Sequence, residues 1–541
     1  MNRHEIKVNG GVVAAGSILT AEAGAELLRN GGNAVDAAVA ANLAAFCAEP
    51  VLTGPFGGGL ALVAGKNIEP VSMNFFSRVP GKGNQADKSN IDFQGIDVRF
   101  GPAIQTFHVG KGSCAIPLLL PGLLELHSRY GSVPLNDVIA PAMAYARDGI
   151  EVSFELARIF QILDPILKLT PEARQIFAPE GELLKAGDSF NAPGLVNVFE
   201  QFATGDITPI LDSFRQTFAA PGGLVTDTDL LDLAPKITKP VHVHAGEFDI
   251  YLSPAPASGG LLVGFGLKLF EKMAPHVWSN PTDKALALVA AMTTTQMARV
   301  QILDPLLHEH GNHAETQLKN FLSESSMERW RNVFHEAFTS RTPIILPPEN
   351  QLGSTTHIST LDIHGLGCSI TSSNGEGSGH IVPGTSAMAN NFMGEEDLHP
   401  QGFHAMPAGS MLTSMMCPTA VTDSHGPKLM LGTGGSNRIR TALLQVLGGH
   451  LFGKQSLEEA VSAPRIHYEG GMLYMESVGT DERPMNAQAF DTLKSLPVEN
   501  LIFDETNMFF GGVNAAGRDY QGAGDKRRGG NIAIVKPESE R

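Results

Sequence analysis

Residues 353–359 read GSTTHIS and follow a stretch rich in proline, residues 342–350 (TPIILPPEN). The prolines predict an exposed linker. From Thr355 onward, the β-branched residues predict a strand over 355–360. Before this junction helical and strand patterns alternate, and after it strands and turns dominate. We therefore expect a layered α/β protein with an αββα pattern and a functional boundary between residues 354 and 355.

A threonine at the start of a strand can become a nucleophile if the peptide bond before it is cut. The freed α-amine of Thr355 would then lie beside its own hydroxyl. Because the reference pKa of an α-amine is near 8, that amine can accept the hydroxyl proton near neutral pH. The precursor could make the cut itself, by attack of the hydroxyl on the preceding carbonyl. A Thr-Thr pair in a strand more often reflects β-propensity alone, so the hypothesis needs further motifs.

The rest of the chain is predicted to form the helices and strands of these layers. Apolar periodicity predicts helices over 20–46 with a break at 31–33, over 114–128, over 136–180 with an interruption at 164–165, over 440–451 and over 456–463. Strands are predicted over 60–64, 241–251, 368–372, 429–432 and 532–535.

Composition narrows the class of protein. The 541 residues are 43% hydrophobic, enough for a large core, and 39 basic against 56 acidic residues give a formal charge of −17. That acidity argues against a nucleic-acid partner, and we expect the short basic cluster at 526–528 to be solvated. We find no apolar run of about 18 residues, so we expect no membrane span. Residues 12–19 form a weak signal-peptide core, so we expect a cytoplasmic protein.

Cysteines and histidines suggest no cofactor. The four cysteines form no CxxC pair and lie in apolar surroundings, which favours buried reduced thiols over a disulfide framework or metal site. The histidines at 308, 310 and 313 match no standard zinc spacing, so we expect surface histidines and no metal.

Several motifs occur in the order found in one known family. Residues 355–359 resemble the T-T-H-x-S that opens the small subunit of γ-glutamyltranspeptidases. The resemblance continues in residues 31–38 (GGNAVDAA) with Glu49-Pro50, in the glycine loop 54–59, in Gly434-Gly435-Ser436 with Arg438, and in Ala463-Pro464-Arg465 with His467. It runs from about residue 10 to the C-terminus and is faint between 180 and 340.

This resemblance implies an Ntn-hydrolase αββα sandwich built from one precursor. The large subunit would be residues 1–354 and the small subunit residues 355–541, held together as a heterodimer. Thr355 would be the nucleophile, and Gly434 and Gly435 would hold the oxyanion through their N–H groups. Ser373, or Ser372 if a gap falls earlier, would be the second hydroxyl beside the threonine.

The resemblance also implies the substrate site. Asn374 or Gly375 matches a family asparagine, and Thr413 and Ser414 match a serine pair near the substrate carboxylate. Asn390-Asn391 and the acidic cluster 395–397, with Glu395 foremost, match the groups that bind the substrate α-ammonium.

The sequence departs from the family where the donor carboxylate is bound. The family's arginine falls on Phe76, and Arg78 could replace it because residues i and i+2 of a strand share a face. Phe392 replaces an amide residue next to Asn390-Asn391, and the connection 397–413 is short, which suggests an open groove.

We expect an autoprocessed N-terminal threonine amidohydrolase and acyltransferase acting on small γ-glutamyl amides such as glutathione, by hydrolysis or transpeptidation. Two alternatives stay open. One is a glutaryl-type acylase of the same superfamily, and the other is a non-catalytic relative that binds a small ligand.

Overall fold

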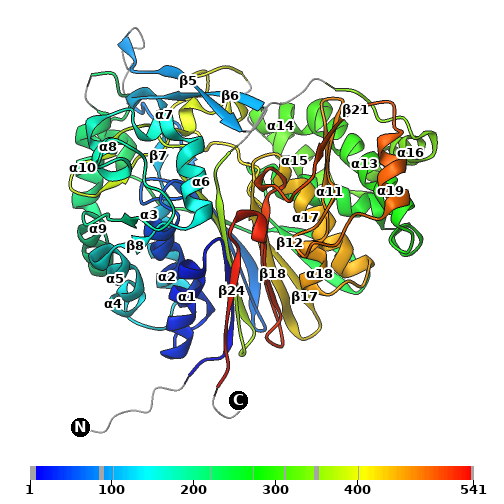
Figure 1. Ribbon diagram of the computed structural model, residues 1–541, viewed down its shortest axis with the longest axis horizontal. Helices are drawn as coiled ribbons and strands as arrows, with labels where there is room; N and C mark the ends of the chain where they lie inside the picture. Colours follow the sequence, from blue (N-terminus) through cyan, green and yellow to red (C-terminus); the bar gives the residue numbers. More distant parts are fainter. Residues whose placement is uncertain are drawn as a thin grey trace.

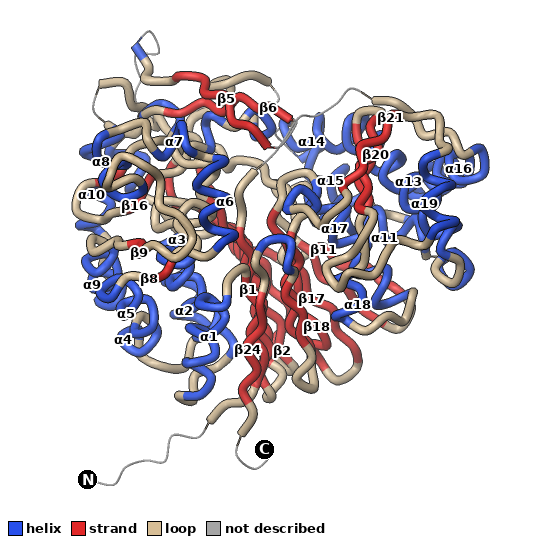
Figure 2. Tube along the Cα trace, viewed as in Figure 1, coloured by secondary structure: helices blue, strands red, loops and turns tan. Residues whose placement is uncertain are grey.

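The structure is a computed structural model that describes residues 8–83, 90–100, 103–219, 221–271, 273–309, 312–346, 353–399 and 401–537. Two β-sheets pack face to face in the centre, and helices cover both outer faces (Figure 1, Figure 2). The expected layered αββα arrangement is confirmed.

The first sheet has seven antiparallel strands. Their order is β10 (Lys236–Thr238), β3 (Ile68–Phe75), β2 (Gly58–Gly65), β14 (Leu366–Ser373), β13 (Thr356–Asp362), β1 (Gly11–Ala15) and β24 (Asn531–Val535). Strands from after the junction at residue 355 pair with strands from before it at three places in this sheet, β2 with β14, β13 with β1 and β1 with β24. A chain cut at that junction would therefore keep its two parts joined by strand pairing.

The second sheet has six antiparallel strands. Their order is β11 (Val241–Ala245), β12 (Phe248–Leu252), β17 (Thr419–Asp423), β18 (Gly426–Gly434), β22 (Gly512–Gly517) and β23 (Gly522–Gly524). The single strand expected over 241–251 is wrong, because the chain turns at Gly246, with φ of 67°, and returns as a hairpin.

The two sheets meet through small and medium apolar side chains. Val12, Leu62, Ala64 and Leu361 come from the first sheet, and Ala420, Met430 and Ala516 from the second. β13 is buried along its whole length, because one face meets the second sheet and the other meets helix α2.

The helices form two layers, on the left and right of Figure 1. The first layer includes α1 (Ile18–Arg29), α2 (Ala34–Ala48), α3 (Leu119–Tyr130), α4 (Leu135–Val138), α5 (Ala140–Asp148), α6 (Phe154–Ile162), α7 (Asp164–Leu167), α8 (Pro171–Phe177), α9 (Leu195–Thr204) and α10 (Thr208–Phe218). The second includes α11 (Gly259–Phe270), α13 (Pro281–Ala298), α14 (Asp304–His308), α15 (Asn312–Asn320), α16 (Glu324–Ser340), α17 (Arg438–Leu447), α18 (Leu457–Ser462) and α19 (Ala487–Lys494).

The start of α2 explains one of the quoted motifs. The Asn33 side chain accepts hydrogen bonds from the backbone N–H groups of Val35 and Asp36, and Asp36 accepts one from the Asn33 N–H. This reciprocal capping box satisfies the N–H groups that a helix start leaves free. The break expected near residues 31–33 is therefore confirmed, and it separates α1 from α2.

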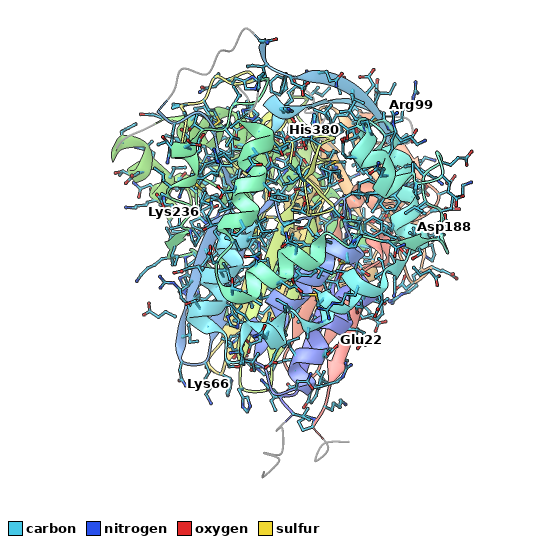
Figure 3. The ribbon with its side chains drawn as sticks, turned by 90° about the vertical axis from the view of Figure 1, so that its left-hand side faces the viewer. Glu22, Lys66, Arg99, Asp188, Lys236 and His380 are labelled. Atoms are coloured by element: carbon cyan, nitrogen blue, oxygen red, sulfur yellow. The ribbon has the colours of Figure 1, made fainter. Side chains whose placement is uncertain are left out.

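One expectation about surface charge is wrong. Lys526 is exposed, but Arg527 is fully buried and forms ion pairs with Glu476 and Asp525. Other charged side chains, including Lys66, Arg99, Asp188 and Lys236, project from the outline of the molecule (Figure 3).

The four cysteines are buried free thiols. Within the described parts of the chain, one helical run, Pro281–His308, is long and apolar enough to cross a membrane. Its apolar window is 78% buried inside the protein, as in the core helix of a folded domain, so length and composition do not assign it to a membrane.

Candidate active site

Ser354, the residue before Thr355, is held by hydrogen bonds at both its carbonyl oxygen and its N–H. The Ser373 hydroxyl donates to the Ser354 carbonyl oxygen at 2.6 Å, and the Gly375 N–H donates to the Ser373 hydroxyl at 2.9 Å. The Ser354 N–H donates to Glu376 Oε1 at 3.1 Å. The carbonyl that Thr355 would attack is therefore fixed in place and polarised by a hydrogen-bond donor.

Thr355 lies against the glycine pair of the second sheet. Along β13, His357 and Leu361 face the second sheet, and the two-residue period of a strand places Thr355 on that same side. A methyl group on Gly434 would lie 2.1 Å from the Thr355 carbonyl oxygen, so only glycine fits there. Gly435 has φ of 125°, a conformation that also favours glycine.

Thr356 and Thr355 have opposite surroundings. The Thr356 hydroxyl donates to Glu49 Oε2 at 2.5 Å, and Thr20 donates to Glu49 Oε1 at 2.6 Å. Glu49 is buried, which raises the pKa of its carboxyl. These contacts anchor Thr356 toward the first helix layer and leave Thr355 as the threonine beside the glycines.

His357 is a structural residue. Its Nδ1 lies 2.8 Å from the Thr371 hydroxyl, and its Nε2 lies 2.8 Å from the Ser359 hydroxyl. Complete burial between the sheets lowers the pKa of its imidazole to about 3. The ring stays neutral, and its hydrogen bonds link β13 to β14 within the first sheet.

Three acidic residues line one side of the junction. A methyl group on Gly375 would lie 2.4 Å from Glu395 Oε1, which places Glu395 directly beside the segment that carries Ser373. Burial, followed by repulsion from Asp397, raises the pKa of Glu376 to about 8. Burial, followed by repulsion from Glu376, raises the pKa of Glu395 well above its usual range. Glu376 Oε2 and Glu395 Oε1 have no hydrogen-bond partner among the described residues.

Two arginines lie on the other side. Arg438 stacks over the Phe509 ring, and burial lowers the pKa of its guanidinium to about 10. A methyl group on Gly435 would lie 3.6 Å from Arg528 Nη2, so this guanidinium lies beside the glycine pair. Arg528 Nη1 is buried and has no hydrogen-bond partner within the described residues. Ser436 connects the two sides, because its hydroxyl donates to Asp397 at 3.3 Å.

The alternative between Ser372 and Ser373 is resolved by their contacts. Ser372 points away from the junction, where its hydroxyl accepts from Asn42 Nδ2 at 2.9 Å and lies 2.9 Å from the Thr53 hydroxyl. Ser373 contacts the junction directly. Asn374 binds the Met388 carbonyl through Nδ2 at 3.0 Å, and its Oδ1 is buried without a partner in the described structure.

Thr413 and Ser414 are buried at the end of the connection 397–413. The Ser414 hydroxyl accepts from the Met416 N–H at 3.0 Å, so it stabilises the turn of that segment. Residues 405–407, 410 and 411 form one wall of a cavity of about 1160 Å³, which α14, α15 and residues 236–242 also line. The lining of this cavity includes none of Thr355, Gly434 and Glu395, so the open groove expected at the donor pocket stays a prediction.

Arg78 does not offer a free guanidinium. Its Nη1 donates to the Asp232 carbonyl, its Nη2 donates to the Ala234 carbonyl at 2.9 Å, and its guanidinium lies 3.6 Å from the Asp232 carboxylate. These contacts tie β4 (Ser77–Arg78) to the segment before β10. The geometry therefore gives Arg78 a structural role in place of the carboxylate-binding role expected from its spacing.

The two phenylalanines that depart from the family pattern contact each other. The rings of Phe76 and Phe392 have centroids 4.6 Å apart, and both side chains are buried. They belong to a small apolar cluster with Leu412 and Met416.

The sequence profile named Gamma-glutamyltranspeptidase matches residues 20–535, which is nearly the whole chain. The chain belongs to the γ-glutamyltranspeptidase family. It is therefore an enzyme of the hydrolase and acyltransferase type, which excludes the non-catalytic alternative. Enzymes of this family are processed from one precursor into large and small chains and act on small amides.

Curated relatives of the chain include proenzymes of more than one kind. The chain is 27% identical to glutathione hydrolase proenzyme 1 of Schizosaccharomyces pombe, over 85% of this chain and 74% of that protein. It is 28% identical to the acylase ACY 1 proenzyme of Pseudomonas sp. strain V22, over 86% of this chain and 84% of that protein. The relatives of this chain thus include both glutathione hydrolases and acylases.

The solved structure of a cephalosporin acylase from Bacillus halodurans has the same fold. It superposes with a TM-score of 0.81 at 21% identity and covers 99% of this chain and 98% of its own. This likeness confirms the layered αββα fold.

Sequence reasoning missed Glu376 and Arg528. Glu376 lies three residues after Ser373 in a glycine-rich turn. Its position shortly after a strand that ends in two serines was the sequence signal that could have identified it. Arg528 was assigned to a solvated cluster, and no local signal separates it from Lys526.

Proposed function

We propose that the chain cuts itself between Ser354 and Thr355 and then uses Thr355 as an N-terminal nucleophile. The observation that supports this most directly is the hydrogen bond from Ser373 to the Ser354 carbonyl, with Thr355 placed against Gly434. The large chain would be residues 1–354 and the small chain residues 355–541.

The processing step balances without a cofactor. The Thr355 oxygen attacks the Ser354 carbonyl carbon, the bond from that carbon to the Thr355 nitrogen breaks, and the nitrogen takes up the hydroxyl proton. Water then opens the ester and gives a Ser354 carboxylate and a free Thr355 hydroxyl. In turnover the same hydroxyl attacks a substrate amide carbonyl, the α-amine of Thr355 accepts the hydroxyl proton, and the Gly434 and Gly435 N–H groups stabilise the oxyanion. The amide C–N bond then breaks, the leaving amine takes up that proton, and water or an acceptor amine releases the acyl group from the Thr355 ester.

Thr355→Ala tests this role. The 57.5 kDa chain, divided in proportion to 354 and 541 − 354 = 187 residues, should yield bands of roughly 38 and 20 kDa. Thr355→Ala should give a single band and no turnover, whereas Thr355→Ser, which keeps a hydroxyl, should retain processing. N-terminal sequencing of the small chain should begin Thr-Thr-His-Ile. Two bands from Thr355→Ala would refute the proposal.

We propose γ-glutamyl amides, such as glutathione, as the substrate class. The support is Glu395, whose buried Oε1 has no hydrogen-bond partner in the described part of the chain and lies beside the segment that carries Ser373. A substrate ammonium would supply the missing positive charge and lower the pKa of Glu395 on binding. Thr413, Ser414 and Asn374 would line the remainder of this pocket.

The donor carboxylate would need a cation other than Arg78. Phe76 and Phe392 make an apolar wall, and the Arg78 guanidinium is engaged by residues 232–234. Arg528 lies beside Gly435, and its buried Nη1 has no partner among the residues that the structure describes, so it is the better candidate. Arg528→Met should then raise KM for γ-glutamyl anilide, while Arg78→Met should leave KM unchanged.

The glutaryl-type acylase is the second candidate, supported by the apolar Phe76 and Phe392 wall. Turnover of γ-glutamyl anilide and glutaryl anilide separates the two, because these substrates differ only in the α-amino group. A clear preference for γ-glutamyl anilide supports the first candidate, and indifference to the amino group supports the acylase.

A further inference from the structure

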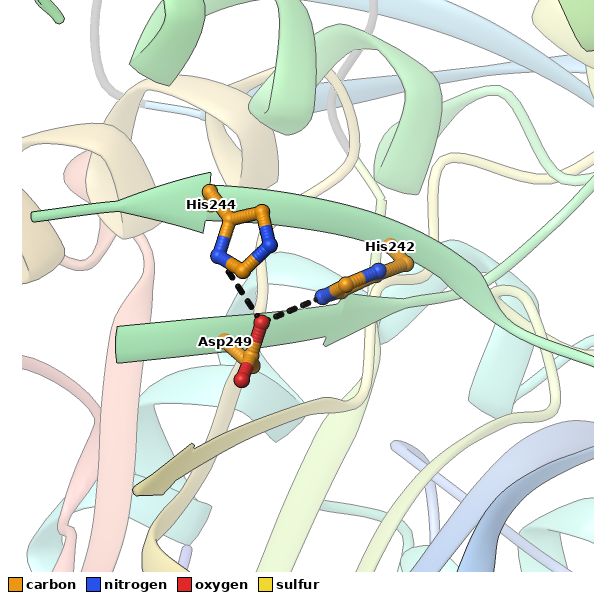
Figure 4. Close-up of side chains that lie close together, drawn as sticks. All are labelled: His242, His244 and Asp249. Atoms are coloured by element: carbon orange, nitrogen blue, oxygen red, sulfur yellow. Dashed lines mark hydrogen bonds and ion pairs between the residues drawn. The ribbon is translucent and has the colours of Figure 1, made fainter. Parts of the chain in front are cut away.

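Two histidines and an aspartate meet on the hairpin at the edge of the second sheet. His242 and His244 are two residues apart on β11, so their side chains share one face, and Asp249 on β12 is the direct cross-strand partner of His244. His242 Nε2 lies 2.6 Å from Asp249 Oδ1, and His244 Nδ1 lies 2.9 Å from the same oxygen (Figure 4).

The three ligand atoms are close enough to bind one ion. They lie within 4.8 Å of one another. A zinc ion bound at about 2.0–2.1 Å separates neighbouring ligand atoms by roughly 3.3 Å in tetrahedral geometry, so small side-chain rotations would open a site at the shared oxygen. The cation would then take the place of the two histidine N–H donors that now contact Asp249 Oδ1.

The site is partly preorganised and open to solvent. The His242 ring stacks on Tyr251 at 4.9 Å, and Tyr251 packs against the apolar cluster between the sheets. The His244 side chain is 70% exposed, so an ion could enter and water could complete its coordination. β11 and β12 are joined by a short turn, which holds all three ligands on one rigid hairpin.

The donor set indicates the class of ion. Two imidazoles and one carboxylate suit zinc and other divalent transition metals, whereas calcium and magnesium prefer sites made entirely of oxygen. Each neutral imidazole can present a lone pair at the inward nitrogen by carrying its proton on the outward one.

We propose that His242, His244 and Asp249 form a binding site for a divalent transition-metal ion such as zinc, separate from the residues around Thr355. His242 also lines the cavity of about 1160 Å³, so the ion would lie at the rim of that cavity.

Zinc titration of the full-length protein by isothermal titration calorimetry, in chelator-treated buffer, tests this site. His244→Ala and Asp249→Asn should each weaken zinc binding by about tenfold or more, because each removes one of three ligands. His335→Ala is the matched control, since it removes an exposed imidazole from α16, and it should bind zinc as the unaltered protein does.

Cobalt gives an independent readout. Titration with Co²⁺ should produce visible absorption bands from a nitrogen- and oxygen-coordinated ion, and His244→Ala should abolish them. Melting curves without metal check that each variant is folded. Unchanged zinc affinity in both site variants, or an unaltered protein that takes up no zinc at about 1 mM, would overturn the proposal.

Discussion

Two pairs of buried carboxylates contrast sharply in this protein. Glu476 and Asp525, in the small-chain segment, place all four of their oxygens on hydrogen-bond donors, chiefly from Arg465 and Arg527. Glu376 and Glu395, beside Thr355, each leave one oxygen without a partner in the described structure, and they repel each other.

The difference separates charges that hold the fold from charges available to a ligand. A buried ion is costly unless it is paired, and removing one partner of a buried pair leaves that cost uncompensated. The pairing around Glu476 meets this requirement within the folded chain. Glu376 and Glu395, near Thr355, have no such pairing among the described residues, so the pKa values of their carboxyl groups are raised. A bound cation would supply the missing positive charge. Substitutions in the two pairs should therefore affect different properties.

Arg527→Met should have the largest effect on stability. It leaves Glu476 and Asp525 buried without their main cation, which typically costs about 3–5 kcal/mol. Urea unfolding of the Thr355→Ala precursor, a single chain, would measure the loss. Lys526→Met is the matched control and should change stability by less than about 0.5 kcal/mol, because Lys526 is exposed. Equal effects of the two substitutions would contradict the contrast between these regions.

Ser373→Ala should slow self-cleavage by about 100- to 1000-fold. It removes the hydroxyl that donates to the Ser354 carbonyl, and one such donor is worth about 3–4 kcal/mol in comparable sites. The rate is read from the disappearance of the precursor band. Ser372→Ala, one residue earlier on the same strand, should process within a few-fold of the normal rate. Equal rates for the two variants would remove Ser373 from the mechanism.

Glu395→Gln should reduce kcat/KM for γ-glutamyl anilide by about 10- to 100-fold, which corresponds to a charged hydrogen bond of about 1.5–3 kcal/mol. Turnover of glutaryl anilide should stay within a few-fold, because that substrate has no ammonium. Glu396→Gln, at the exposed neighbouring position, controls for the loss of one carboxylate. If both substrates lose activity equally, Glu395 shapes the pocket without binding the ammonium.

The fold and the junction could be predicted because their signals are local. The strand that begins directly after Thr355, the capping box at Asn33 and the glycine pair at 434–435 each appear within a few residues. The hairpin turn at Gly246 was missed because strand-forming residues continue on both sides of it.

Long-range contacts could not be predicted. The partners that bury Arg527 include Glu476, which is 51 positions away in the sequence. The spacing of Phe76 and Arg78 was a sound geometric reason to propose Arg78, but carbonyls more than 150 residues later occupy its guanidinium. The environment of Glu376 likewise depends on Ser354 and Asp397, which only the folded chain brings together.

Glu376→Gln should give the smallest effect, a change in the pH dependence of stability. The folded-state pKa of Glu376 is raised to about 8, so between its ordinary pKa of 4.5 and pH 8 the folded protein binds more protons than the unfolded chain. Stability of the Thr355→Ala precursor should therefore fall as pH rises. His357 has the opposite sign, but its contribution is complete above its ordinary pKa of 6.5.

The informative window is thus pH 6.5 to 8. Urea midpoints should decline across this window in the precursor, and Glu376→Gln should decline less, because its amide can still accept the Ser354 N–H but cannot ionise. Some slope should persist in that variant, since Glu395 has a raised pKa for the same reason. If the stability of the precursor is flat or rises from pH 6.5 to 8, positive charge within the folded chain already compensates Glu376 and Glu395. The contrast with Glu476 and Asp525 would then fail.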